Sequence, residues 1–172
     1  MLVDKRIIDW RNKMRKVMFN NFDEHKMIGD ALLIVRARDD KLDHLTFDLS
    51  QVPEELLRET VVRVIDKSNP EAYIVITNNK MVLKPADQIE AMIKEHKDAG
   101  SISKMKDSKD IIVFTYETKA VGSVEIYEII NTEKYAVLNR STLLNVMDIE
   151  ENVFFQGLLN KNRHQKLIQM LN

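Results

Sequence analysis

Glu117 and Lys119 have the residue types and spacing of a metal-dependent nuclease strand. They lie in IIVFTYETKAVGSVEIYEII, residues 111–130, a pattern that predicts two strands joined by a tight turn. In such a site the glutamate and a second carboxylate hold a divalent cation, and the lysine orients the attacking water. Because magnesium requires its oxygen ligands at about 2.0–2.1 Å, a second acid must stand beside Glu117.

The predicted hairpin supplies no such acid. If residues 119–122 form the loop, Glu117 lies opposite Val124, and Glu125 points to the other side of the sheet. Glu128 shares the face of Glu117 but lies four residues along the strand, roughly 13 Å away. The remaining candidate is Asp48, from an earlier predicted strand. The alternative interpretation is that Glu117 and Lys119 only end a hairpin arm, because Glu-x-Lys often occurs by chance in a chain with 31% charged residues.

The four histidines have no partner at a catalytic or metal-binding spacing. His44 and Asp48 share one strand face, but they are roughly 13 Å apart in an extended strand. His25, His96 and His164 have no second histidine at helical spacing. All four are predicted to be surface or helix-end residues.

Composition excludes several kinds of cofactor chemistry. The chain has no cysteine, which removes disulfides, thiolate metal sites and cysteine nucleophiles. Its four glycines are scattered, so neither a P-loop nor a dinucleotide-binding loop can form. We therefore expect no cofactor.

The charge balance does not favour nucleic acid. Net charge is −1, from 26 basic and 27 acidic residues. The first predicted helix is nevertheless basic, which gives a weaker hypothesis of anion, membrane-surface or nucleic-acid contact through Lys5, Arg6, Arg11, Lys13, Arg15 and Lys16. No apolar run is long enough for a membrane span, and the first residues do not resemble a secretory signal, so we expect a cytoplasmic protein.

Hydrophobic periodicity predicts one α+β domain over residues 1–172, with a mixed, mostly antiparallel sheet packed with helices and amphipathic helices at both termini. Helices are predicted over 4–20, 53–67, 86–98 and 157–171, with Gly100 ending the third. Strands are predicted on both sides of a turn at 39–40, over 72–77, and in three stretches between 111 and 139. We also predict a turn at 78–79 into a short strand over 81–83, and a polar connection over 101–110.

The stretch ENVFFQG, residues 151–157, resembles the recognition sequence of the tobacco etch virus protease, with Phe154 where that enzyme prefers tyrosine. Helix-like sequence follows it, which favours native sequence over a tag. That protease is expected to cut the chain here only if the segment is exposed.

Two functional hypotheses follow. The first is a non-enzymatic cytoplasmic domain that binds a protein partner or forms a homo-oligomer, because no catalytic constellation is evident and the terminal amphipathic helices offer apolar faces. The alternative is a divalent-metal-dependent nuclease or hydrolase centred on Glu117, with Asp48 and Lys119 in support.

Overall fold

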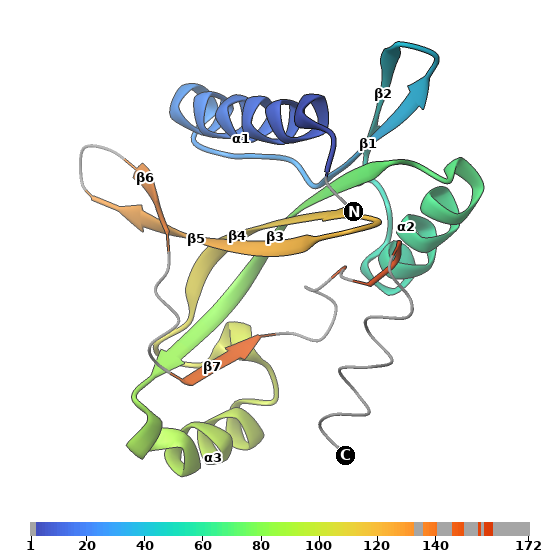
Figure 1. Ribbon diagram of the computed structural model, residues 1–172. Helices are drawn as coiled ribbons and strands as arrows, with labels where there is room; N and C mark the ends of the chain where they lie inside the picture. The colour runs from blue at the N-terminus through green and yellow to red at the C-terminus, as the bar shows by residue number, and fades with distance from the viewer. Residues whose placement is uncertain (1–2, 133–135, 141–145, 150–154, 156, 160–172) are drawn as a thin grey trace.

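A curled antiparallel sheet crossed by a long helix organises the chain in the computed structural model (Figure 1). The structure describes residues 3–132, 136–140, 146–149, 155 and 157–159. The fold is α+β, as predicted. The sheet is mostly antiparallel, as predicted, and every strand pair in the described residues is antiparallel.

The elements follow one another in the order α1 (Lys5–His25), β1 (Ala31–Arg38), β2 (Lys41–Asp48), α2 (Glu54–Ser68), β3 (Ala72–Lys84), α3 (Ile89–Ala99), β4 (Lys109–Thr118), β5 (Gly122–Asn131), β6 (Ala136–Arg140) and β7 (Val146–Ile149). Short 3₁₀ turns cover Ala86–Gln88 and Ile102–Lys104. The strand order is β2-β1-β3-β4-β5-β6, and β7 also pairs with β3.

Strand β3 is the longest strand and has neighbours on both sides. One edge pairs with β4 from Ala72 to Met81, and the other pairs first with β1 and then, from Met81 onward, with β7. The predicted turn at 78–79 is wrong, because Asn78 and Asn79 continue the ladder opposite Ile112 and Ile111. Pairing with the apolar strand β4 therefore outweighs the local turn preference of two asparagines.

The two faces of the sheet carry separate apolar cores. Alternation along β3 sends Ile74 and Ile76 to one face and Tyr73 and Val75 to the other. Helix α1 covers the first face and α2 the second, so the two helices lie on opposite sides of the sheet (Figure 1). The buried residues of α1 are Ile7, Trp10, Met18 and Phe22, and those of α2 are Leu57, Val61 and Ile65.

Capping groups fix the helix ends. The carboxylate of Asp4 accepts the backbone N–H of Arg6 at 2.9 Å and begins α1. That helix runs to His25, beyond the predicted end at residue 20, because Phe22 adds a fully buried contact one turn after Met18. Gly100 adopts a left-handed φ of 78° and ends α3, as predicted.

The later chain differs from the prediction in the connection over 101–110 and in one additional strand. The connection 101–110 is not simply polar, because Ile102 and Met105 are buried beside Met92 of α3. Strand β7 was not predicted. Residues 157–159 form bends, and the remainder of the predicted helix 157–171 lies outside the described residues. Within the part of the chain that the structure describes, no helix is long and apolar enough to cross a membrane.

Replacing Phe22 tests how strongly α1 is held. Phe22→Ala is expected to lower the free energy of unfolding by about 3–5 kcal/mol, because it leaves a cavity between α1 and the sheet. Asn20→Ala, an exposed change on the same helix, should stay within about 0.5 kcal/mol of the wild type. Urea denaturation measures both, and equal effects would contradict the packing described for α1.

Candidate functional site

Glu117 is a buried carboxylate paired across the sheet with Tyr73. The side chain of Glu117 is on β4, directly opposite Tyr73 of β3, and the residue is only 3% exposed. The Tyr73 hydroxyl donates a hydrogen bond to the Glu117 carboxylate and also contacts the carbonyl oxygen of Phe155. Burial, followed by the hydrogen bond to Glu117, raises the pKa of Tyr73 well above its ordinary value. Tyr73 therefore remains a protonated donor.

The same carboxylate holds a distant part of the chain. Glu117 Oε2 accepts the backbone N–H groups of Gly157 at 2.8 Å and Leu158 at 3.1 Å. Phe155 is fully buried in the core beneath α2, and Gly157 has a left-handed φ of 82° that favours glycine. Glu117 thus anchors a turn of the polypeptide, which sequence reasoning did not anticipate.

The hairpin that carries Glu117 has a different register from the predicted one. Glu117 lies opposite Gly122 and not Val124, because the loop begins at Thr118. The Thr118 hydroxyl accepts the N–H groups of Ala120 at 3.1 Å and Val121 at 3.0 Å and closes the turn. A threonine that begins such a turn is the signal that was missed.

Asp48 and Lys119 do not meet Glu117. Pairing places Asp48 in one row with Ala31, Ile76 and Phe114, on the α1 face, whereas Glu117 belongs to the opposite face. Three strand spacings, about 14 Å, separate β2 from β4. Lys119 Nζ lies 3.4 Å from a carboxylate oxygen of Glu71.

The described residues therefore supply no ligand set for the nuclease hypothesis. Among them, no group of three or more histidine or acidic side chains is placed to hold a metal ion. His25 lies 3.8 Å from Glu24, and His44 stacks on Trp10 with ring centroids 6.1 Å apart. His96 is in the last turn of α3. The predicted surface or helix-end position of His164 lies outside the described residues.

Half of the basic residues on α1 act within the domain. The guanidinium groups of Arg11 and Arg15 lie over the rings of Tyr116 and Phe114, at 5.1 and 5.6 Å. Arg15 Nε also donates to Glu125 at 2.8 Å, and the Tyr127 hydroxyl donates to the same carboxylate. Arg6 pairs with Asp4. The predicted anion-binding face is thereby reduced to Lys5, Lys13 and Lys16, which are exposed.

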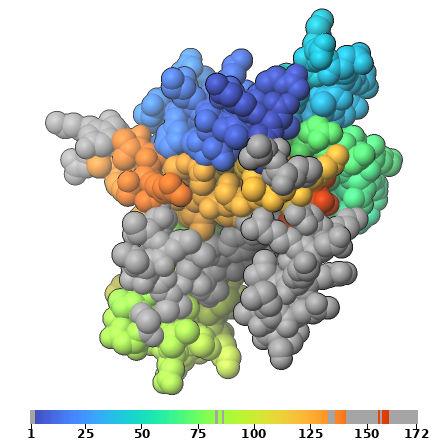
Figure 2. Space-filling model, in the orientation of Figure 1, coloured from blue at the N-terminus to red at the C-terminus, as the bar shows by residue number. Residues whose placement is uncertain are grey.

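An open apolar groove runs along α1. Two adjoining hollows of about 460 and 770 Å³ share Met14, Leu33 and Thr46 as lining residues, and together they extend from Arg6 to His25. Their other wall is the β1–β2 hairpin, which lies next to α1 on the molecular surface (Figure 2). We call these two hollows the α1 groove. Val17 and Met27 line it and are 41% and 70% exposed.

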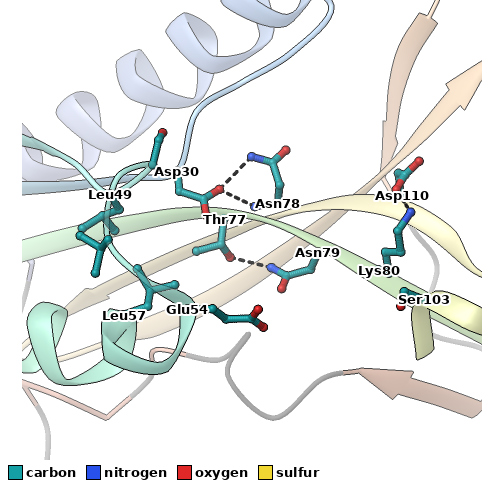
Figure 3. A pocket seen from close by; sticks show the side chains of 12 residues that line it. Asp30, Leu49, Glu54, Leu57, Thr77, Asn78, Asn79, Lys80, Ser103 and Asp110 are labelled. Atoms are coloured by element: carbon teal, nitrogen blue, oxygen red, sulfur yellow. Dashed lines mark hydrogen bonds and ion pairs between the residues drawn. The ribbon is translucent and has the colours of Figure 1, made fainter. Parts of the chain in front are cut away.

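A second, polar cleft of about 480 Å³ lies where the edge of β3 passes from β1 to β7 (Figure 3). The Asp30 carboxylate accepts the backbone N–H of Asn78 at 2.8 Å, in place of a strand partner. The Asn79 side-chain amide donates to the Thr77 hydroxyl at 2.8 Å, and Lys80 pairs with Asp110. These lining groups satisfy one another, which indicates a structural junction between strands.

Comparison with known proteins gives no further guide to function. No family model, no curated protein and no solved structure matches the chain. The functional conclusion therefore depends on the geometry of the chain itself.

Cleavage by tobacco etch virus protease tests the anchor at Glu117. The native chain should resist cleavage before Gly157, because Phe155 is buried and the Gly157 N–H is bound. Glu117→Ala should raise the cleavage rate at least about tenfold, since hydrogen bonds to a charged group contribute about 1.5–3 kcal/mol each.

Glu128→Ala is the matched control, because Glu128 is an acid of the neighbouring strand paired with Lys109. Urea-unfolded protein, diluted into protease, gives the rate for the open sequence. Native protein cut as fast as the unfolded sample would contradict the anchor.

Stability at acidic pH tests the Arg15 contact. Burial would raise the pKa of Glu125, but hydrogen bonds from Arg15 and Tyr127 outweigh it and leave the pKa below its ordinary value of 4.5. A lowered native pKa stabilises the fold above the unfolded pKa, and this contribution is lost as pH falls through the native pKa. Unfolding free energy should therefore fall less steeply below pH 4.5 in Glu125→Gln than in wild type. Asn20→Ala, an exposed change that removes no titrating group, should retain the wild-type slope, and identical slopes in all three would contradict the prediction.

Proposed function

We propose that the protein is non-enzymatic and acts in the cytoplasm through protein–protein contact at the α1 groove. The observation that carries this proposal is the exposure of Val17 and Met27 in an open groove lined mainly by apolar side chains. Single exposed apolar residues are common on protein surfaces and need no explanation. A contiguous apolar surface of this kind is instead typical of interaction sites.

The lining residues suit a polypeptide ligand. Met14 and Met27 contribute unbranched, adaptable side chains, which are frequent on surfaces that bind protein segments. Covering one such side chain contributes about 1.5–3 kcal/mol. The groove extends over some five turns of α1, roughly 28 Å, which is long enough for a helix or strand of a partner.

The chemistry of the described residues supports binding over catalysis. Glu117, the acid of the nuclease hypothesis, already accepts hydrogen bonds from Tyr73, Gly157 and Leu158. The three basic residues of α1 that contact other groups, Arg6, Arg11 and Arg15, are held by the domain itself.

Site-specific photo-crosslinking in native host cells tests this function. A photoreactive residue at Met27 should give a covalent adduct with a polypeptide, because the α1 groove is expected to be covered in the cell. The same residue at Leu56, which is 47% exposed on α2, is the control for non-specific capture. Adducts at Leu56 but none at Met27 would overturn the proposal.

A further inference from the structure

We infer that the α1 groove binds a second copy of the same chain, with the two α1 helices antiparallel. This inference rests on the proposed function and names its partner. It is based on three observations: the charge order along α1, the protrusion of Met27, and the hollow at the opposite end of the groove.

The charge order along α1 is self-complementary. Lys13, Val17 and Glu24 are four and seven residues apart, so they lie along one line of the helix surface. All three are exposed, with the base toward the start of the helix and the acid toward its end. An antiparallel copy reverses this order and brings Lys13 against Glu24 of the second copy.

In a two-fold symmetric dimer each contact between the two chains occurs twice. The register that pairs Lys13 with Glu24 of the second copy also brings Val17 close to Asn20 of the second copy. The two-fold axis passes midway between this contact and its symmetry-related copy. The same register carries Met27 of each chain to the level of Trp10 in the other. Both ends of the groove are therefore used in one closed, isologous contact.

Met27 is an exposed apolar side chain, and the hollow near Trp10 is a partly apolar space that could accept it. Met27 follows the left-handed residue Lys26 that ends α1, and it is the most exposed large apolar side chain of the described residues. The hollow near Trp10 has a volume of about 460 Å³ and includes Met14, Leu33 and Leu42 among its apolar lining. A thioether side chain is flexible enough to fill such a space.

These features favour a second copy over an unrelated partner. The protruding Met27 lies just after the end of α1, and the hollow that accepts it lies beside the first half of the same helix, which also carries the opposite charges. A surface that carries both members of each pair is complementary to itself only in the antiparallel arrangement. A heterologous partner would require only one member of each pair.

Sedimentation equilibrium of the full chain over a wide concentration range tests the inference. Wild type should dimerise, and Met27→Glu should weaken dimerisation at least about tenfold, because each dimer would bury two carboxylates. Lys13→Glu and Glu24→Lys should each weaken it about tenfold, since each change reverses two ion pairs. The double variant Lys13→Glu/Glu24→Lys should recover most of the wild-type affinity.

Lys94→Glu, an exposed charge reversal on α3, is the matched control and should leave dimerisation unchanged. Circular dichroism melts verify that every variant folds. A double variant weaker than both single variants would overturn the antiparallel register. A wild type that stays monomeric at all concentrations would overturn the second copy as partner. Adducts of Met27 with another protein would still support the proposed function in that case, whereas their absence would remove both.

Discussion

The continuity of β3 is the constraint on which the rest of the structure depends. This strand of thirteen residues pairs with β4 from Ala72 to Met81 along one edge and with β1 and then β7 along the other, so early and late strands of the sequence meet on one backbone. Its alternation divides the domain into two cores, one under α1 and one under α2. A turn at Asn78 would instead take the second half of β3 out of the β4 ladder and remove the edge on which β7 pairs.

Polar groups in this protein mostly fasten one element to another. Glu117 and Tyr73 hold the turn at Gly157 against the sheet, and Arg15 joins α1 to Glu125 on β5. A buried carboxylate is costly unless hydrogen bonds satisfy it, and three donors meet Glu117. Residues whose types suggest catalysis therefore have sufficient structural reasons to be where they are.

Local signals in the sequence predicted part of this fold correctly. Three helices were predicted from signals that span only a few residues, and all three are found. These signals are the apolar periodicity of α1, the acidic residues at the start of α2 and the glycine after α3. The hairpin of β1 and β2 is equally local. These features depend on contacts close along the chain, which a sequence pattern records directly.

The remaining features depend on residues far apart in the sequence. Asn78 and Asn79 favour a turn until the neighbouring strand β4 is considered, and the role of Glu117 depends on Gly157, forty residues later. The α1 groove could not be predicted from the sequence either. Met14 reads as an ordinary core residue of an amphipathic helix, and only the position of the β1–β2 hairpin shows that the groove stays open.

The divided edge of β3 has a consequence for synthesis of the chain. The first half of that edge can pair with β1 as soon as β3 emerges, because β1 is already made. The second half, near Met81, waits for β7, which follows about 60 residues later, or roughly 3–12 s at ordinary rates of translation. Throughout that interval the nascent chain presents an unpaired, partly apolar strand edge. Co-translational folding of this protein therefore has a defined vulnerable window, which closes only when β7 is made.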